Sequence, residues 1–297
     1  MAVVAGVDKP TAAQYNSIQT TIQSVFNNYG NTAASSQLAL PGTSTKITSA
    51  AWGNLRSDIL KCNRHQQVSA GSLTDPTTGT KIAAADYNAY ETMANACSTN
   101  YLLDSGNYNT ISTLGTASHN GTSPGGPWGA SGRNTLRHTF TLTWASASAA
   151  NYFFNAGGKI RISSTATGGS IGTPGTKDYS WKSLANSVGT VGLGYSMWNG
   201  LSGSITQQYT LSASTYVPNV YKIFANKSGA SAIQFYIEWE DLNDPGGTWT
   251  IDEDVTATIT STIEQYYASG VNQIDVSGYL PTISSSAIGP LPSPDPA

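Results

Sequence analysis

The sequence predicts an α+β protein in which an N-terminal three-helix repeat module is followed by an antiparallel β-sandwich domain. Two observations predict this fold class: a repeat with helical spacing fills the first third of the chain, and segments with strand alternation follow residue 133. A chain of 297 residues is long enough to bury two cores. We divide it into a helical repeat module at 1–106, a Gly/Ser/Thr-rich linker at 107–132, a β-sandwich domain at 133–270 and a Pro/Ser-rich C-terminal arm at 271–297.

The helical module rests on an internal repeat. KPTAAQYNSI, KITSAAWGNL and KIAAADYNAY begin at Lys9, Lys46 and Lys81, so the motif recurs after 37 and then 35 residues. Its apolar positions follow helical spacing and carry Tyr15, Trp52 and Tyr87, then Ile18, Leu55 and Tyr90, then Ile22, Ile59 and Ala94, then Val25, Cys62 and Cys97. This pattern predicts helices near 11–28, 48–66 and 83–103, with Thr11 or Thr48 as an N-cap.

Two arrangements are open for these helices. They form a small antiparallel bundle within one chain, or they align with copies from neighbouring subunits as a short coiled-coil collar. Cys62 and Cys97 occupy the same position of two repeats and are interpreted as buried thiols, a disulfide, or a metal or catalytic pair. His65 lies three residues after Cys62, which allows a Cys–His pair, although a solvated histidine at a helix end is the simpler interpretation.

The β-sandwich domain rests on seven segments with strand character. In AIQFYIEWED, apolar and polar side chains alternate, so Ile233 and Phe235 face one side while Glu238 and Glu240 face the other. SWKSLANSVG predicts one short helix that covers an open end, and Pro218 marks an edge strand or a bulge. The segments are LRHTFTLTW, NYFFNAGGKIRISS, VGLGYSMW, SITQQYTLS, YVPNVYKIFAN, AIQFYIEWED and WTIDEDVTATITSTIEQYY.

Two segments carry a resemblance to a known class. KITSAAWGNLRSDILKCNRHQ and LTWASASAANYFFNAGGKIRISS resemble segments of uncharacterised virion structural proteins of tailed bacteriophages, and the match covers about half of the chain. In that class the first segment recurs in N-terminal helices. The second resembles the opening hairpin of a β-domain, with Asn155, Gly157 and Gly158 at its turn. The resemblance implies a structural component of the neck or collar, a tail fibre or the baseplate, located in the virion after assembly in the host cytoplasm.

The composition agrees with a protein that works inside an assembly. Only 10% of the residues are charged, with 14 Lys plus Arg against 17 Asp plus Glu, and no basic run suits nucleic acid. Neither a secretory signal nor a membrane-spanning segment is expected. The expected partners are other virion proteins and identical subunits, in a homo-oligomer of order three or six, with neither nucleic acid nor membrane.

The best candidates for chemistry are acidic. They are Glu238, Glu240, Asp241 and Asp244, followed by Asp252, Glu253 and Asp254. Paired carboxylates serve glycoside hydrolysis when a cleft holds them apart, and Asp241, Asn243 and Asp244 offer oxygen ligands for calcium. The simpler interpretation is that the glutamates lie on the solvated face of a strand and the aspartates form turns.

No catalytic motif accompanies these acids. His119 and His138 have no Ser or Cys partner in a recognisable motif, and G-x-S-x-G, H-E-x-x-H and phosphate-loop patterns are absent. The sequence therefore predicts a protein that is not an enzyme, with no catalytic, cofactor-binding or metal-binding residues. The alternative function is a receptor-binding or adhesin module for host-surface glycans, in which Trp128, Trp181, Trp198 and Trp249 form a sugar-stacking platform with Trp128 as the most exposed member.

Overall fold

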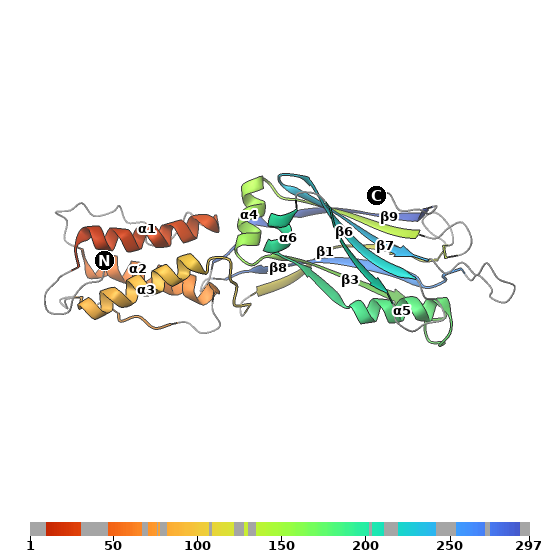
Figure 1. Cartoon of the computed structure of the whole chain (residues 1–297), viewed down its shortest axis with the longest axis horizontal. Helices are drawn as coiled ribbons and strands as arrows, with labels where there is room; N and C mark the ends of the chain where they lie inside the picture. Colours follow the sequence, from red (N-terminus) through yellow and green to blue (C-terminus); the bar gives the residue numbers. More distant parts are fainter. Residues whose placement is uncertain are drawn as a thin grey trace. The chain divides into compact units, whose positions relative to one another are not determined.

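The structure is a computed structural model that describes residues 10–30, 47–66, 71–75, 77, 82–106, 109–121, 128–129, 135–201, 204–210, 219–241, 254–270 and 274–291. These residues form six α-helices and two antiparallel sheets, which confirms the α+β class (Figure 1). The chain divides into two compact units. The first, here the bundle unit, comprises Met1–Thr110, Ser148–Gly158 and Tyr267–Leu280, and the second, here the β unit, comprises Ile111–Ala147, Lys159–Tyr266 and Pro281–Ala297.

Three long helices of the bundle unit occupy the predicted positions. They are α1 (Ala12–Asn28), α2 (Ser49–Gln66) and α3 (Ala84–Thr99). The Thr11 hydroxyl accepts a hydrogen bond from the Gln14 amide, and the Thr48 hydroxyl accepts one from the Ala51 amide, so both predicted N-caps are present. The third helix ends four residues earlier than predicted, at Thr99 rather than 103.

All three helices run in the same direction, so the antiparallel bundle, one of the two arrangements left open by the sequence, is wrong. At their N-terminal ends the Tyr15 and Trp52 rings lie 4.9 Å apart, and Trp52 also contacts Tyr87 edge-on. At their C-terminal ends the Tyr29 ring lies 5.0 Å from the His65 ring. Residues 71–75, which lie between α2 and α3, accordingly run back along α2, where Arg56 Nε donates to the Leu73 carbonyl at 2.8 Å.

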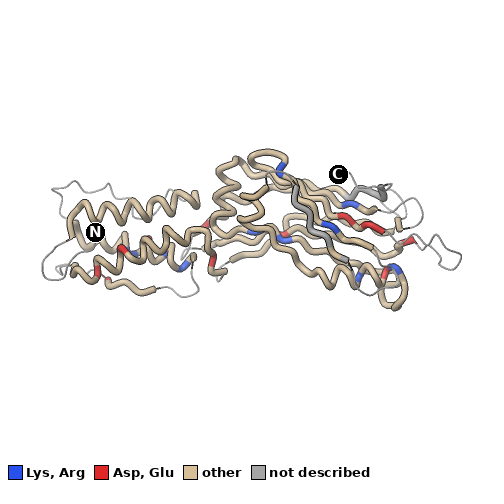
Figure 2. Tube along the Cα trace, viewed as in Figure 1, with Lys and Arg blue, Asp and Glu red and all other residues tan. Residues whose placement is uncertain are grey.

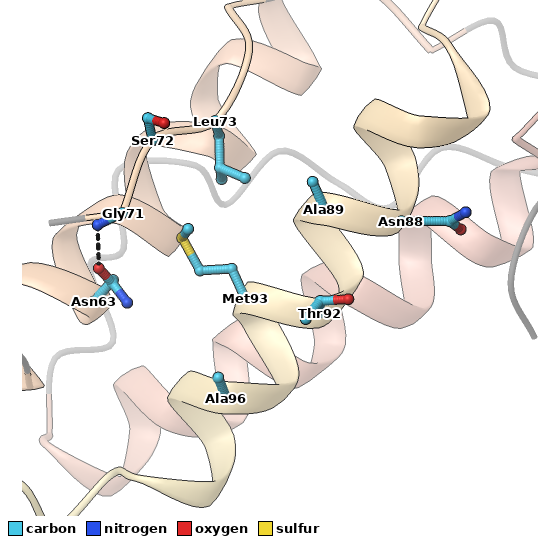
Figure 3. Close-up of a pocket in the computed structure, with 9 residues that line it drawn as sticks. All are labelled: Asn63, Gly71, Ser72, Leu73, Asn88, Ala89, Thr92, Met93 and Ala96. Atoms are coloured by element: carbon cyan, nitrogen blue, oxygen red, sulfur yellow. Dashed lines mark hydrogen bonds between the residues drawn. The ribbon is translucent and has the colours of Figure 1, made fainter.

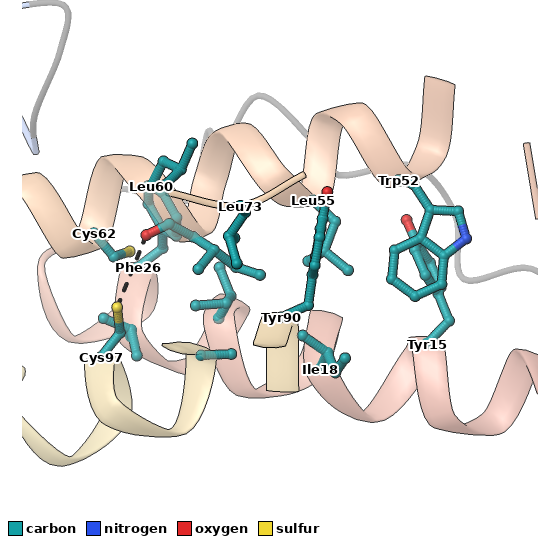
Figure 4. Close-up of a cluster of buried hydrophobic side chains, with 14 of the residues drawn as sticks. Tyr15, Ile18, Phe26, Trp52, Leu55, Leu60, Cys62, Leu73, Tyr90 and Cys97 are labelled. Atoms are coloured by element: carbon teal, nitrogen blue, oxygen red, sulfur yellow. Dashed lines mark hydrogen bonds between the residues drawn. The ribbon is translucent and has the colours of Figure 1, made fainter. Parts of the chain in front are cut away.

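The core of the bundle unit is built from the predicted apolar stripes. All twelve side chains of the four repeat positions are buried, and Figure 4 shows several of them, among them Tyr15, Trp52 and Tyr90. Trp52 meets Tyr15, Tyr87 and Tyr90 with interplanar angles of 80–89°, the edge-on geometry that aromatic rings favour. The hydroxyls of Tyr15 and Tyr90 also donate hydrogen bonds to backbone carbonyls, so both polar groups have partners inside the core.

Later parts of the chain complete the bundle unit. Helix α4 (Ala147–Asn155) contributes Asn155, whose side-chain amide donates to the Asn28 carbonyl at the end of α1 at 2.8 Å. The short 3-10 helix η1 (Ser277–Tyr279) contributes Tyr279, whose hydroxyl donates to the Gly30 carbonyl, and Ile274 is buried in the same core. These groups satisfy carbonyls that a helix end leaves without intrahelical partners.

The β unit contains two sheets. The four-stranded sheet has the order β1 (Asn109–His119), β8 (Thr258–Ala268), β3 (Lys159–Thr167), β4 (Thr190–Leu193). The five-stranded sheet has the order β5 (Ser204–Thr210), β6 (Val220–Gly229), β7 (Ala232–Glu240), β2 (Thr135–Thr143), β9 (Thr282–Leu291). Helix α5 (Lys177–Val188) packs on β3 and β5, and α6 (Tyr195–Gly200) packs on β4. Helix α5 is the predicted short helix.

Edge strands form within two segments that were expected to be a linker and an arm. Within the expected linker, residues 109–119 form β1, whose Ser118 hydroxyl contacts the Thr260 hydroxyl of β8 at 2.8 Å. Within the expected arm, residues 282–291 form β9, which pairs with β2. Both strands are rich in Ser and Thr and lie at sheet edges, so neither needs the alternating apolar pattern that marks a half-buried strand.

The expected hairpin with Asn155, Gly157 and Gly158 at its turn is also wrong. The segment forms β2, then α4, then β3, and the two strands belong to different sheets. Gly157 has φ +79° where α4 ends, and its amide donates to the Phe154 carbonyl, which is the role of a glycine after a helix. Pro218, expected at an edge or a bulge, lies outside the described residues.

Candidate functional site

Three of the seven acidic residues predicted as candidates for chemistry lie in ion pairs. Glu238 pairs with Arg137, Glu240 Oε2 lies 2.7 Å from Lys222 Nζ, and Asp241 Oδ2 lies 2.7 Å from Lys177 Nζ. The three acidic side chains are buried, so the expectation of a solvated strand face is wrong. Figure 2 shows that charged positions are sparse along the described chain and that both signs occur near β7.

Strand register explains the Glu238–Arg137 pair and brings Lys222 close to Glu240, two residues along the same face of β7. Strand β7 lies between β6 and β2, and both Lys222 and Arg137 stand directly opposite Glu238. Opposite charges on neighbouring strands attract. The long side chains of Arg137 and Lys222 reach across to the glutamates of β7. The Arg137–Glu238 and Lys222–Glu240 pairs thus link β7 to its two neighbouring strands, whereas Asp241 pairs with Lys177 of helix α5.

The start of α5 brings four distant segments together. Thr176 caps the helix, and the next two residues are the buried Lys177 and Asp178. The Asp178 carboxylate accepts four hydrogen bonds of 2.6–3.0 Å, from the Ser170 amide, the amide and hydroxyl of Thr256, and the Ala257 amide. Lys177 Nζ donates to the Gly129 carbonyl and pairs with Asp241.

Of the three predicted calcium ligands, Asp241 lies within the described residues. Asp241 faces the Lys177 ammonium, a cation that competes with calcium for the same carboxylate. Asn243 and Asp244 lie outside the described residues, as do Asp252 and Glu253, while Asp254 is exposed. Among the residues with described positions, no group of three or more His, Cys, Asp or Glu is arranged to hold a metal ion.

A buried polar chain crosses from one sheet to the other. His138 Nδ1 of β2 lies 2.9 Å from the Ser261 hydroxyl of β8, which lies 2.9 Å from the Ser164 hydroxyl of β3. Ser164 in turn lies 3.0 Å from the Tyr221 hydroxyl of β6. No sequence motif joins His138 to Ser261, because 123 residues separate the pair.

The His138–Ser261 pair has the spacing of a base and a nucleophile, but both side chains are fully buried. Burial, assisted by the neighbouring His119, lowers the pKa of His138 to about 4. The imidazole is therefore neutral at pH 7. His119 is buried as well, and its Nδ1 accepts a hydrogen bond from the Gly121 amide. The geometry of these groups suits internal hydrogen bonding, since both side chains are fully buried among the described residues.

The proposed sugar-stacking tryptophans are buried rather than exposed. Trp128 and Trp181 are fully buried with ring centroids 5.4 Å apart, and Trp239 continues the cluster at 5.5 Å from Trp181. Trp198 is 3% exposed and packs against Trp144. Trp128, expected to be the most exposed, pairs through its backbone with Val255. The fourth platform member, Trp249, lies outside the described residues.

The cysteines of the bundle unit are free, buried thiols. Figure 4 shows both sulfur atoms between α2 and α3, where Cys97 Sγ lies 3.8 Å from the Ile59 carbonyl. Burial raises the pKa of Cys97 to about 12 and raises that of Cys62 as well, so neither is a thiolate at pH 7. His65 is buried against Tyr29, not solvated at a helix end.

One open pocket lies on the bundle unit. It measures about 490 Å³ and is lined by Asn63, residues 71–73 and one face of α3 (Figure 3). Met93 points into it from α3, and the Gly71 amide donates to Asn63 Oδ1 at 2.8 Å on its far side. The lining is mainly apolar and carries neither an acid nor a base, so the pocket suits an apolar side chain rather than a reaction.

The outer side of the four-stranded sheet is rich in hydroxyl groups. Ser163 faces Thr262, Thr165 faces Thr260, and Thr167 faces Thr258 across β3 and β8. These six residues, here the hydroxyl face, are half-buried or exposed, whereas the alternate residues Ile162, Ser164, Ile259 and Ser261 point into the core. The six residues of the hydroxyl face are uncharged donors and acceptors. The same side of the two strands continues into Lys159 and the Arg161–Glu264 ion pair.

Comparisons with family models, with curated proteins and with solved structures gave no match. Within the described part of the chain, no helix is both long and apolar enough to cross a membrane.

Proposed function

We propose that the chain is a structural component of a tailed-phage virion, in the neck, a tail fibre or the baseplate, and that it acts through protein–protein assembly. Its partners are other virion proteins and identical subunits, and its location is the virion, after assembly in the host cytoplasm. The resemblance of residues 46–66 and 142–164 to phage structural proteins supports the virion class. The burial of the candidate catalytic acids in ion pairs supports assembly over chemistry.

The hydroxyl face is the observation that carries the assembly role. Identical copies of an uncharged surface meet without like-charge repulsion, and hydroxyls both donate and accept hydrogen bonds. A face of this kind is therefore complementary to itself. The low charge of the whole chain points the same way, since only 10% of its residues are charged.

The proposal includes two finer features of the fold. The first is that the two sheets form a β-sandwich, which is supported by the hydrogen bonds of Ser164 with Tyr221 and of His138 with Ser261 from sheet to sheet. The second is that the three long helices are copies of one repeat. The contact between Tyr15 and Trp52, 37 residues apart, supports it because the same number separates the first two motifs.

The oligomeric state of the full chain tests the proposal. Light scattering should find a closed oligomer of order three or six. Thr165→Lys places a charge on the hydroxyl face and should weaken association by about tenfold or more, because identical copies then repel one another. Thr173→Lys is the matched control, since Thr173 is an exposed residue of the same unit outside that face, and it should leave the mass unchanged.

Two results would contradict self-assembly through this face. One is a wild-type chain that stays monomeric at every concentration. The other is an oligomer that responds equally to both lysine substitutions. The alternative of a glycan-binding adhesin has less support, because three of the four proposed stacking tryptophans are buried. Binding of the full chain to a panel of bacterial surface glycans would favour that alternative.

A further inference from the structure

Lys177 and Asp241 form a deeply buried ion pair. Lys177 Nζ lies 2.7 Å from Asp241 Oδ2, and the two side chains are 1% and 2% exposed. Lys222 and Glu240 approach each other equally closely, at 2.7 Å, but their side chains are 13% and 8% exposed. The two pairs therefore share a distance and differ in their access to water.

Aromatic residues adjoin both members of the buried pair. Trp181 lies one helical turn after Lys177 on α5, and Trp239 lies two residues before Asp241, with its ring 5.5 Å from that of Trp181. Trp128 directly precedes Gly129, whose carbonyl accepts a hydrogen bond from Lys177 Nζ. All three indole rings are fully buried. The ion pair therefore lies next to a cluster of three buried indole rings.

Burial of this kind changes the chemistry of an amine and a carboxylate. Two isolated charges are costly to remove from water, and transfer of one proton from the ammonium to the carboxylate removes both charges. The products are a neutral amine with a free electron pair and a carboxylic acid with a hydroxyl that can leave. Fixed contact between two such groups replaces a slow encounter in solution with a high effective concentration.

We propose that Lys177 and Asp241 join in an intramolecular amide (isopeptide) bond. The Lys177 Nζ electron pair attacks Asp241 Cγ, a carbon–nitrogen bond forms, and the bond from Cγ to one carboxyl oxygen breaks. That oxygen leaves as water with two protons that came from the ammonium. The ammonium and carboxylate are thus converted into one amide and one water molecule, without oxidant, metal or cofactor. The Gly129 carbonyl orients the amine before the attack.

The cross-link would close a loop from α5 to the end of β7. The loop contains β4 and α6, and also β5, β6 and β7, which are three of the five strands of the larger sheet. A covalent closure restricts the unfolded chain in the same way as a disulfide, but reducing agents leave it intact. Such a bond suits a protein that must keep its sheets paired under force or in the absence of cellular repair.

Intact-protein mass spectrometry of the full chain under denaturing conditions tests the proposal. The wild-type mass should be lower than the sequence mass by one water molecule, and protease digestion should release a branched peptide that joins the segments containing Lys177 and Asp241. Lys177→Arg keeps a cation beside Asp241 and should restore the full mass. Lys222→Arg, in the more exposed pair, should leave the loss of water unchanged.

Asp241→Asn gives a second signature that does not depend on the stability of the arginine variant. Attack of Lys177 on the asparagine amide releases ammonia instead of water, so the mass deficit should become that of ammonia. A wild-type chain at full mass, even after prolonged warming below its unfolding temperature, would overturn the proposal. A water loss that maps to another aspartate would also overturn it.

Discussion

Buried histidines show how single residues of this protein respond to their surroundings. His65 packs against Tyr29 in the bundle unit, and within the described part of the chain neither of its ring nitrogens has a hydrogen-bond partner. Burial lowers its pKa to about 4. His138 in the β unit shares the depressed pKa, but its Nδ1 bonds to Ser261. A buried histidine therefore makes a hydrogen bond between strands in the β unit, whereas in the bundle unit it packs like an apolar side chain.

His65→Phe should flatten the acid dependence of the bundle unit. Unfolded His65 takes up a proton as the pH falls below about 6.5, while folded His65 stays neutral to about pH 4, so the free energy of unfolding decreases across that window. The wild type should lose about 2 kcal/mol more than the variant between pH 7.5 and pH 5. Urea unfolding followed by far-ultraviolet circular dichroism measures this difference. Equal losses in the two proteins would show that His65 is not held neutral.

At the scale of elements, the first turn of α5 organises the β unit. Asp178 accepts hydrogen bonds from Ser170, eight residues earlier, and from residues 256 and 257, which lie 78 and 79 residues later. Its position at the N-terminus of a helix also favours a negative charge. SWKSLANSVG predicts this helix, but three of the four hydrogen bonds that Asp178 accepts come from a segment that meets α5 only in the folded protein.

Asp178→Ala should destabilise the β unit by at least about 3 kcal/mol, because several buried donors lose a charged acceptor. Asp178→Asn keeps the shape of the side chain and one acceptor oxygen, so it should lower the free energy of unfolding by less than Asp178→Ala. Lys182→Ala, on the same helix and half-exposed, should stay within about 0.5 kcal/mol of the wild type. Urea unfolding monitored by tryptophan fluorescence compares the three variants. A loss from Asp178→Ala as small as that of Lys182→Ala would contradict this role.

The parallel direction of α1, α2 and α3 leads to a distance prediction. Spin labels at Ala13→Cys and Ala50→Cys, in a background with Cys62→Ala and Cys97→Ala, should lie close together because both positions begin their helices. A label at Lys61→Cys in place of Ala50→Cys should be about 16 Å farther along the bundle. Pulsed electron paramagnetic resonance measures both separations. The reverse order of distances would indicate antiparallel helices.

At the scale of the whole molecule, the chain passes repeatedly between its two units. Helix α4 and residues 267–280 belong to the bundle unit although they lie between or after strands of the β unit. Tyr267, Ile274, Val276 and Tyr279 pack on the helical core. The predicted division at 106, 132 and 270 missed this interleaving, because it assumed that each domain is one continuous stretch.

A truncated protein that begins at Ser131 should therefore be unstable. It lacks α1, α2 and α3 but keeps α4 and residues 267–280, whose apolar side chains would lose their core. We expect aggregation, or strong binding of a hydrophobic dye, in comparison with the full chain. A soluble truncated protein with a cooperative unfolding transition and no dye binding would show that the β unit is independent of the helices.

The sequence by itself determined the local features of this protein. Helical spacing from Tyr15 to Val25 and its recurrence set the positions of α1, α2 and α3, and alternation from Ile233 to Trp239 set β7. Both signals arise within a few residues, where the period of the side chains reports the local backbone. The apolar stripes found this way are also the buried ones.

Only the tertiary structure decided which way the helices run, which edge strands join the sheets, and what the polar residues contact. Glu238 looks like a solvated residue in sequence, yet register sets Arg137 and Lys222 opposite it. The partner of Asp241 is Lys177, 64 residues earlier, and the partner of His138 is Ser261, 123 residues later. These contacts depend on how distant segments pair and on how they exclude water. A local sequence pattern predicts neither the pairing nor the exclusion of water.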